Sequence, residues 1–565
     1  MDPGQRRQQT ARATRLALLA AAIVVAAGFL LGHLDGGAGP RVAEASSSQG
    51  GAEGGDPAEA PTAALEVPLA PMEPEPARKK PSAAAAGPTD PELTRRIEAK
   101  VLEAVREAER RSRGKVTGAN SVVAVRVVEP GTGRELVARL ADQSLRPASN
   151  MKLVTSAAAL VELGPGGEFE TRFDTSADLS GGVLRGDLVV HAGGDPLFDP
   201  GADGAVGHLL RPVVEELRRA GIREVAGDLV LDEGTYLRPG PAPGWPPSSQ
   251  YWQEHCALAA GLTANGSCLT AFVEAGAPGA DAFSEVRPRP SGLERVGKVT
   301  TASSRSRLDI AVGATARRAT LRGTIPASVR TWSSRFAHPD PVGLFGETLV
   351  AALADGGIRV AGSVRRERGR PRGRLLALLR TPIREVLAPI NADSNNAVAD
   401  QLFLMLGERV VGEGSRAGGR RAVESALKRL GVSTDGLEQV DGSGLSRDDR
   451  VTARQLTALL DGVLDLDAGI REAFVDSLAV AGESGSLERR MRGTVAAGRV
   501  HAKTGWIRGT SALSGYVDTT GGRRLAFSIL VAYPDVGGLN TSVWKPMQDA
   551  ICVELAGVGG GGSVR

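Results

Sequence analysis

The chain has 565 residues, and its 68 Lys and Arg nearly balance its 65 Asp and Glu, which leaves a formal net charge of +3. The charged residues of both signs are spread along the sequence and form no long basic stripe of the kind that nucleic-acid binding requires. Nucleic acid is therefore excluded as a partner. The chain is long for one compact domain, and we expect a main domain with at least one further module.

Residues 1–34 have the pattern of an export signal. An uncharged apolar run over 16–31 follows four basic residues, Arg6, Arg7, Arg12 and Arg15. This pattern predicts export to the periplasm or cell envelope, with the segment either cleaved as a signal peptide or kept as an inner-membrane anchor over residues 16–34. Residues 35–88 are rich in Ala, Pro, Gly and Glu, which predicts a disordered tether.

Folded structure is expected from residue 89 onward. Thr89 and Glu92 have the spacing of a capping box, which predicts a charged helix to about residue 111. The next pattern predicts a β-hairpin formed by strands over 121–128 and 135–140. The pattern after it predicts a buried helix over 150–163.

The middle of the chain, residues 174–335, has short strand-like runs broken by Gly and Pro, and we interpret it as an inserted strand-rich region. It contains one helical pattern, at 213–220. Later helical patterns lie at 343–354, 396–406, 419–430, 453–464 and 470–478. Strand patterns at 511–516 and 524–533 and a terminal helical pattern at 544–556 complete an α/β sandwich begun by the hairpin. The predicted main domain therefore combines residues 89–173 with 336–565.

Among the possible catalytic centres, the sequence favours a serine nucleophile with a lysine as its base. None of the six histidines has the spacing of metal ligands, and the chain lacks a Gly-x-Ser-x-Gly sequence. These patterns disfavour a zinc peptidase and a Ser-His-Asp hydrolase. We therefore expect no metal and no cofactor.

The pattern Ser-x-x-Lys occurs at Ser112/Lys115, Ser149/Lys152, Ser425/Lys428 and Ser542/Lys545. Only Ser149 stands at the start of an apolar helix, where unpaired N–H groups favour an oxyanion and the i, i+3 spacing puts Lys152 on the same face. The first alternative lies in a polar stretch, the second lies in mid-helix, and the last has no downstream partners. Sequence context therefore predicts Ser149 as the nucleophile and Lys152 as its base.

Two later triplets extend this pattern. A lysine base must be neutral, which requires burial and a nearby second cation that lowers its pKa. Lys503-Thr504-Gly505 is the only Lys-Ser/Thr-Gly triplet, and Ser394-Asn395-Asn396 is the only Ser-x-Asn triplet. Each is expected at the boundary of a helix or strand, so Lys503 is a candidate for the second cation.

These three boxes, in this order, resemble the signature of the penicillin-binding proteins and serine β-lactamases. The first interval is 394 − 149 = 245 positions and the second is 503 − 394 = 109. The long first interval resembles class C low-molecular-mass penicillin-binding proteins, the D-alanyl-D-alanine carboxypeptidase/endopeptidase family S13, which carry inserted domains there. The resemblance runs over 122–552 and implies a transpeptidase-like α/β sandwich. Further matching segments are Gly193 to Pro196, Gly244 to Pro246 and Asp441 to Arg447.

The resemblance implies a reaction on peptidoglycan peptides. Ser149 would attack the carbonyl of D-Ala-D-Ala while Lys152 accepts its proton, and water would later release the acyl group. Ser394 and Asn396 would pass the proton to the leaving amine and hold the peptide. β-Lactam antibiotics would acylate the same serine as covalent inhibitors.

The resemblance also implies contacts with the substrate. Lys503 would supply positive charge for the terminal carboxylate and help to keep the lysine base neutral, and Thr504 would bond that carboxylate beside Gly505. The backbone N–H groups of the nucleophile and of Trp506 would form the oxyanion hole. Trp506 is bulkier than the family leads us to expect, which leaves the substrate preference open.

Two outlying residues and a cysteine pair have open interpretations. Arg447 is either a contact for an acidic stem peptide or a surface arginine, and Asp232 could reach a stem-peptide amine from the insert. In an exported protein Cys256 and Cys268 could close a small disulfide loop, the alternative being buried thiols.

Two other functions remain open. One is an esterase or slow β-lactamase built on the same three boxes. The other is a cell-wall-binding protein without turnover, which the intact Ser149, Lys152 and Lys503 disfavour.

Overall fold

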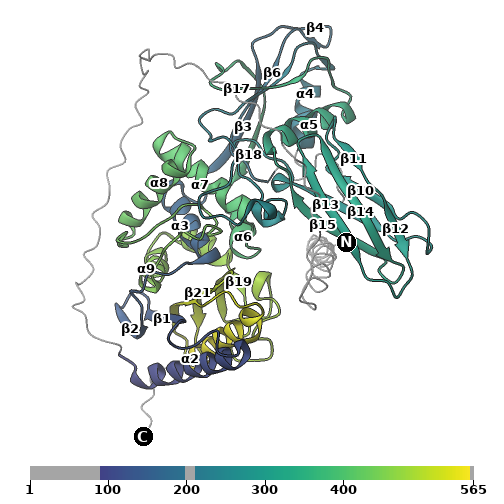
Figure 1. The fold of residues 1–565 in the computed structure, drawn as a ribbon. Helices are drawn as coiled ribbons and strands as arrows, with labels where there is room; N and C mark the ends of the chain where they lie inside the picture. Colours follow the sequence, from purple (N-terminus) through teal and green to yellow (C-terminus); the bar gives the residue numbers. More distant parts are fainter. Residues whose placement is uncertain (1–88, 198–209, 560–565) are drawn as a thin grey trace, which may run out of the picture.

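The computed structural model describes residues 89–197 and 210–559. The predicted export segment 1–34 and tether 35–88 lie outside those residues. A main α/β domain and a strand-rich insert are visible in Figure 1, where the first strands and the last strands of the chain lie together in one sheet.

The main domain is built on a six-stranded antiparallel sheet with the order β19-β20-β21-β22-β1-β2. Its strands are β1 (Val122–Glu129), β2 (Arg134–Arg139), β19 (Ala479–Val480), β20 (Val500–Ile507), β21 (Thr510–Asp518) and β22 (Arg524–Ala532). The pairing of β1 with β22 sets Val122 opposite Ala532. The predicted α/β sandwich, with the N-terminal hairpin joined to the C-terminal strands, is therefore confirmed.

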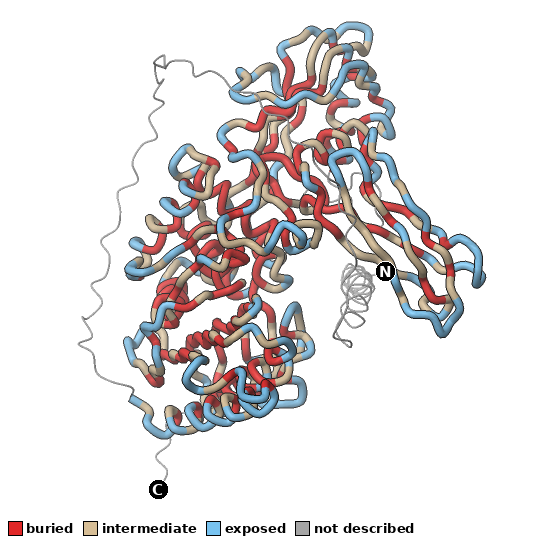
Figure 2. The backbone as a smooth tube through the Cα atoms, viewed as in Figure 1, coloured by how far each residue is buried: buried red, intermediate tan, exposed pale blue. Residues whose placement is uncertain are grey.

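Helices cover both faces of this sheet. On one face α2 (Pro91–Ser112) and α11 (Lys545–Ala556) pack together over a shared apolar core. The other face is covered by a helical layer, and Figure 2 shows its centre buried. That layer contains α3 (Met151–Leu163), α6 (Ile383–Asn391), α7 (Asn396–Val411), α8 (Arg416–Arg429), α9 (Ala453–Leu464) and α10 (Ala468–Asp476).

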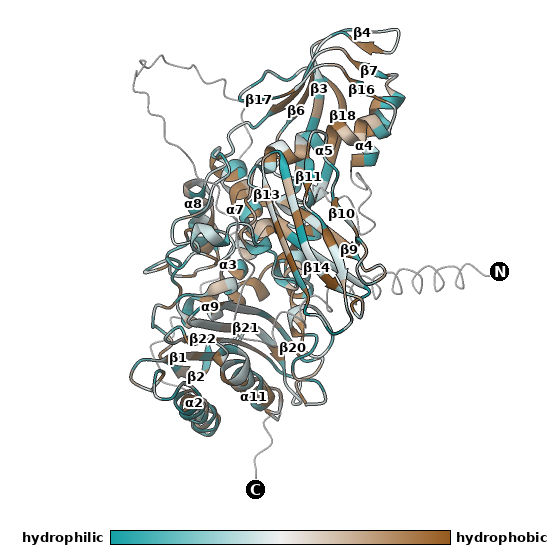
Figure 3. Cartoon of the chain, turned by 45° about the vertical axis from the view of Figure 1, so that its right-hand side comes forward, coloured by the Kyte–Doolittle hydropathy of each residue, from teal (hydrophilic) through white to brown (hydrophobic). Residues whose placement is uncertain are grey.

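The first helix begins one residue later than its sequence pattern predicts. Asp90, and not Thr89, is the N-cap, because its carboxylate accepts a hydrogen bond from Leu93 N at 2.9 Å and Pro91 occupies the first turn. The hydroxyl of Thr89 donates instead to Glu135 O at 3.0 Å. In Figure 3 most of α2 is hydrophilic, as expected for a surface helix with one buried stripe.

In its described residues, the insert contains four small sheets and two α-helices, α4 (Leu210–Arg219) and α5 (Pro341–Asp355). Two of the sheets lie nearest these helices. The first contains β3 (Glu168–Thr175), β6 (Leu188–His191), β8 (Leu229–Asp232), β17 (Val364–Glu367) and β18 (Arg374–Pro382). The second contains β4 (Leu179–Ser180), β5 (Val183–Leu184), β7 (Glu224–Val225) and β16 (Arg359–Val360). The other two contain β9 (Cys268–Glu274), β10 (Phe283–Arg287) and β15 (Thr331–Ala337), and β11 (Glu294–Val296), β12 (Val299–Ala302), β13 (Asp309–Thr315) and β14 (Arg318–Pro326).

Strand pairing extends the insert beyond the predicted limits of 174–335. β3 pairs antiparallel with β18 along its whole length, from Glu168 opposite Pro382 to Thr175 opposite Arg374. Just outside this pair, Ile383 N donates to Gly167 O at 2.8 Å. The chain thus leaves and re-enters the main domain at one place, so a long insertion can be accommodated without separating α3 from α6.

The Cys256–Cys268 disulfide is not formed in the structure. Both cysteines are buried thiols: Cys256 lies in a 3₁₀ turn, and Cys268 begins β9 and packs with three alanines of a small apolar cluster. Burial raises the pKa of Cys256 to about 12, which keeps this sulfur protonated and unreactive. The prediction of a disulfide loop is corrected to the alternative of buried thiols.

Candidate active site

The three boxes meet at one end of α3. Ser149 lies in a short 3₁₀ helix, Ala148–Asn150, that leads directly into α3. Every residue from Met151 to Val161 is buried, so α3 is the central helix of its layer, in agreement with its mostly apolar sequence. The nucleophile candidate therefore stands on a rigid element that packing holds in place.

Lys152 is completely buried, and its ammonium group has three hydrogen-bond acceptors. Lys152 Nζ lies 3.1 Å from Ser149 Oγ, 2.6 Å from Asn396 Oδ1 and 2.7 Å from the carbonyl oxygen of Ser443. The side chain thus joins the first box to the second, with its nitrogen within proton-transfer distance of the serine hydroxyl.

Burial is the main cause of the altered pKa of Lys152. It lowers the pKa of this lysine to about 8, while the carboxylates of Asp400, Asp441 and Asp449 oppose the shift. The sequence led us to expect a second cation as a further cause. The interaction between the two lysines instead changes the pKa of Lys503, which is lowered well below its usual range, first by burial and then by the charge of Lys152.

The second box lies in the turn before α7. The side chain of Asn395 caps this helix by accepting from Val398 N at 3.2 Å, which leaves Asn396 as the first helical residue. Ser394, just before the cap, has a φ of +65°, an uncommon conformation for a residue other than glycine. Asn396 Nδ2 donates to His255 O at 2.8 Å, and this bond turns the amide oxygen toward Lys152.

The third box lies within β20 rather than at its start. Pairing with β19 stops at Ala502, so the strand edge over 503–507 is not covered by β19. Lys503 is fully buried and its Nζ donates to Thr504 O at 2.9 Å, while Thr504 Oγ1 donates to Ser486 Oγ at 2.9 Å. Trp506 is 54% exposed.

A close backbone approach locks β20 against the segment that carries Ser149. Asn150 Nδ2 donates to Lys503 O at 2.9 Å. A Cβ atom at Gly505 would lie only 2.9 Å from Pro147 O, so a residue with a side chain does not fit there without a shift. The glycine of this box is thus required by packing.

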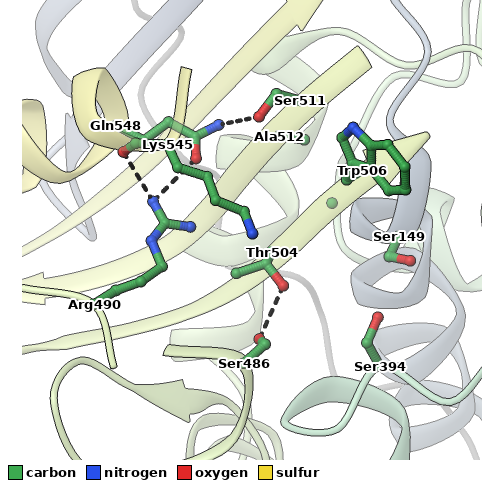
Figure 4. Close-up of a pocket in the computed structure, with 11 residues that line it drawn as sticks. Ser149, Ser394, Ser486, Arg490, Thr504, Trp506, Ser511, Ala512, Lys545 and Gln548 are labelled. Carbon is green, nitrogen blue, oxygen red and sulfur yellow. Dashed lines mark hydrogen bonds between the residues drawn. The ribbon is translucent and has the colours of Figure 1, made fainter. Parts of the chain in front are cut away.

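A cavity of about 180 Å³ opens beside Ser149 (Figure 4). Its lining residues are Ser149, Ser394, Ser486, Arg490, Thr504, Gly505, Trp506, Ser511, Ala512, Lys545 and Gln548. In Figure 4 Ser149 and Ser394 lie at one end of the cavity, and the hydroxyl group of Ser394 points toward Ser149. Thr504 separates that end from the basic side chains of Arg490 and Lys545.

Comparison with known proteins agrees with this geometry. The model of the D-Ala-D-Ala carboxypeptidase 3 (S13) family matches residues 109–555. The chain belongs to this family. It is similar to a D-alanyl-D-alanine carboxypeptidase of Actinomadura sp. (strain R39), at 34% identity over 77% of this chain and 81% of that protein. It is also similar to a carboxypeptidase of Mycobacterium tuberculosis, at 27% identity over 83% of this chain and 89% of that protein.

A solved structure shares the fold of this family member. The crystal structure of penicillin binding protein 4 from Haemophilus influenzae covers 80% of this chain and 99% of its own, with a TM-score of 0.66 and 23% identity. At that identity the likeness shows the fold alone.

Several residues of the S13 site are not predicted by the sequence. Ser443, whose carbonyl accepts from Lys152, lies in a matching segment whose only predicted site residue is Arg447. Lys545 belongs to a Ser-x-x-Lys pattern that its place near the end of the chain disfavours. Arg490 and Gln548 carry no sequence signal, because only the packing of α11 brings them to the cavity.

Two predicted site residues are not brought to the cavity. Asp232 is buried at the end of β8, where its carboxylate contacts His191 Nδ1 at 2.9 Å and accepts from the backbone N–H groups of Gly234, Gly369 and Arg370. Through these bonds the carboxylate of Asp232 holds a turn of the insert together. Asp232 therefore does not reach the site, contrary to the expectation from the sequence. Arg447 is half-buried outside the cavity, and its carbonyl accepts from Arg146 Nε at 2.9 Å.

Over residues 89–197 and 210–559, no group of three or more His, Cys, Asp or Glu side chains is arranged to hold a metal ion. In the same ranges no helix is both long and apolar enough to cross a membrane. The predicted anchor, residues 16–34, lies outside the described residues.

Proposed function

We propose that this protein is a serine D,D-peptidase that acts on peptidoglycan stem peptides, as a D-Ala-D-Ala carboxypeptidase, a D,D-endopeptidase or both, through an acyl-enzyme at Ser149. One observation carries the proposal. Lys152 Nζ lies 3.1 Å from Ser149 Oγ in a site where burial lowers the pKa of the lysine to about 8, so an appreciable fraction is neutral near pH 7. Membership of the S13 family supports the same reaction.

The geometry suits acyl transfer in two stages. Ser149 Oγ forms a bond to the carbonyl carbon of the penultimate residue while its proton passes to Lys152 Nζ. The C–N bond of the tetrahedral intermediate then breaks, and the proton held by Lys152 passes through Ser394 to the leaving amine, which leaves Lys152 neutral again. Water next attacks the ester carbonyl and loses a proton to Lys152 Nζ. The bond from the carbonyl carbon to Ser149 Oγ then breaks, and Lys152 returns that proton to Ser149 Oγ, which regenerates the serine.

The uncovered edge of β20 supports an extended substrate. A peptide laid along residues 504–506 can pair with the strand as an added β-strand. The backbone N–H groups of Ser149 and Trp506 act as the oxyanion hole in this proposal. Asn396 holds the peptide and orients Lys152, with which it shares a 2.6 Å hydrogen bond.

The test is labelling with a fluorescent penicillin together with D-Ala release from a pentapeptide. Penicillin binding protein 4 from Haemophilus influenzae has been solved in a complex with a β-lactam, which supports the choice of probe. Ser149→Ala should abolish both the covalent label and D-Ala release. The matched control is Ser425→Ala, because Ser425 belongs to another Ser-x-x-Lys pattern on α8, and this variant should keep both activities.

Each contrary result has a distinct meaning. Label that survives Ser149→Ala would contradict the assignment of the nucleophile. Label without peptide turnover in the wild-type protein would favour a binding protein, and rapid release of hydrolysed penicillin would favour a β-lactamase.

We also propose that the protein works outside the cytoplasm, because its substrate is there and four arginines precede the apolar run 16–31. N-terminal sequencing of the mature protein and cell fractionation test this proposal. Recovery of the full-length chain in the cytoplasm would contradict it.

A further inference from the structure

One small sheet of the insert carries a large share of the positive charge of the chain. Residues 291–330 form β11, β12, β13, β14 and the loops between them, which together we call the basic sheet. This segment contains eight Arg and Lys but only two Asp and Glu, so its net charge is 8 − 2 = +6. The whole chain has a net charge of +3, so the rest of it is negative, at 3 − 6 = −3. All eight cationic residues are exposed: Arg295, Lys298, Arg305, Arg307, Arg317, Arg318, Arg322 and Arg330.

The two faces of the basic sheet differ in character. Ala319 and Leu321 of β14 are buried against an apolar core of the insert. Because side chains alternate along a strand, Arg318, Thr320 and Arg322 lie on the opposite, outer face. The two arginines are four residues apart, which corresponds to about 13 Å along the strand.

Small residues of β13 lie beside these arginines on the outer face. The register of β13 against β14 sets three of them opposite residues 318, 320 and 322, namely Thr315, Gly313 and Ala311. These positions add little bulk, so an extended chain can lie close to the backbone between the arginines. The threonine hydroxyls are potential hydrogen-bond donors to such a chain.

The loop that joins β12 to β13 continues the row of cations. It carries Arg305 and Arg307, and Arg307 is four residues from the position on β13 that lies opposite Arg322. The loop is held by a hydrogen bond in which Ser328 Oγ donates to Ser304 O at 2.8 Å. The row of cations therefore extends from the middle of β14 to a loop at the end of the sheet.

Most of the charge in this row is unbalanced. Within residues 89–197 and 210–559, no carboxylate lies within ion-pair distance of Arg305, Arg307 or Arg322. Arg318 pairs with Glu294 at 2.9 Å, but both side chains are more than half exposed, so this pair is weak. Apart from Glu294, the basic sheet has one carboxylate, at position 309. The outer face therefore keeps a positive potential that attracts anions.

We propose that the outer face of the basic sheet binds an extended polymer with phosphate groups along its chain, and so holds the protein on anionic material of the cell envelope. Cations repeated along one strand match anions repeated along a polymer. The planar guanidinium of arginine can donate two parallel hydrogen bonds to one phosphate. Between the arginines, the outer face of β13 and β14 has no large apolar side chain that would enter a lipid bilayer, which favours a polymer over a membrane.

This binding surface is separate from the site of the proposed peptidase reaction. No residue of the basic sheet lines the cavity beside Ser149. Figure 1 shows β13 and β14 apart from the strands of the main sheet. Polymer binding and acylation can therefore be tested independently.

The experiment measures the binding of fluorescently labelled, long-chain inorganic polyphosphate to the full chain by fluorescence anisotropy, over a series of salt concentrations. A triple variant, Arg305→Gln with Arg307→Gln and Arg322→Gln, removes the three unpaired charges. It should weaken binding roughly tenfold or more. Its affinity should also fall less steeply with salt, because fewer counterions are released when the polymer binds.

The matched control removes three exposed arginines from helices of the main domain, through Arg95→Gln, Arg106→Gln and Arg384→Gln. It has the same net charge as the first triple variant and should keep its affinity within twofold of the wild-type value. Equal losses in the two variants would overturn the inference, because attraction by the overall charge would then explain the binding.

Three further results bear on the inference. No binding of polyphosphate by the wild-type chain would overturn it. Tighter binding to vesicles of phosphatidylglycerol and phosphatidylcholine than to polyphosphate would also overturn it, in favour of a membrane surface. Penicillin labelling at Ser149 should be the same in all variants, which shows that they are folded and separates a failure of this inference from a failure of the proposed peptidase function.

Discussion

At the scale of single residues, the proposed mechanism makes the pKa of Lys152 set the pH dependence of the reaction. A protonated lysine cannot accept the serine proton, and burial lowers the pKa of Lys152 to about 8. The active fraction therefore grows as pH rises through that value. We expect kcat/KM for D-Ala release to rise about tenfold per pH unit below pH 8 and to level off above it, measured with a pentapeptide.

The partner of Lys152 on α7 gives this prediction a direct check. Asn396→Asp would place a carboxylate at an atom 2.6 Å from the lysine nitrogen, stabilise the ammonium form and move the midpoint upward by roughly one to three pH units. Asn395→Asp is the control, because the side chain at 395 caps α7 instead, and aspartate caps equally well. An unshifted midpoint in Asn396→Asp would argue against Lys152 as the base.

At the scale of elements, the loop after α8 packs against the segment that carries Ser149. Gly444 has a φ of +79°, and a Cβ atom there would overlap the carbonyl oxygen of Ala148. Gly444→Ala should therefore combine backbone strain with a clash and lower the free energy of unfolding by about 2–4 kcal/mol. Penicillin acylation should slow as well, since Ser149 follows Ala148.

A second glycine separates the two causes. Gly436 has a φ of +69°, but a Cβ atom added there would meet no other atom within 4 Å, so Gly436→Ala introduces the strain without the clash. We expect a loss of about 1 kcal/mol and a normal acylation rate. Urea denaturation and stopped-flow labelling measure both quantities. Equal behaviour of the two variants would show that the contact with Ala148 has no role.

At the scale of the whole molecule, the insert supports the site that it interrupts. Trp245 Nε1 donates at 2.7 Å to the carboxylate of Asp441, which also accepts from the backbone N–H groups of Ser443, Gly444 and Ser446. The insert thus fixes the loop whose carbonyl binds Lys152. The Arg365 to Arg374 stretch has a different role, because Arg365, Arg366 and Arg370 pair with carboxylates of the insert itself.

Replacing Trp245 with Phe tests this coupling. Trp245→Phe should cost about 1–2 kcal/mol of unfolding free energy, because a bond to a charged acceptor is lost, and should slow acylation. Trp252→Phe is the matched change, since Trp252 packs within the insert against an apolar cluster, and it should leave the acylation rate unchanged. Identical acylation rates in the two variants would contradict a link from the insert to the site.

The helices were predictable where their sequence periodicity is strong. The pattern over 453–464 matches α9 residue for residue, and the pattern over 150–163 matches α3 to within one residue. α6 escaped prediction, because it has only nine residues and contains Pro389. The predicted limits of the insert were too narrow, because only the pairing of β18 with β3 shows that both strands belong to the insert.

The sequence by itself determined the family resemblance, the order of the three boxes and the choice of Ser149 among four similar patterns, because these depend on residue types and local helix position. Only the tertiary structure decided which charges face the cavity. In the folded protein Lys503 is buried within β20, and Asp232 is hydrogen-bonded inside the insert. Lys545 on α11 lines the same cavity as Thr504. Burial and charge pairing depend on contacts between segments hundreds of residues apart, and no local pattern records them.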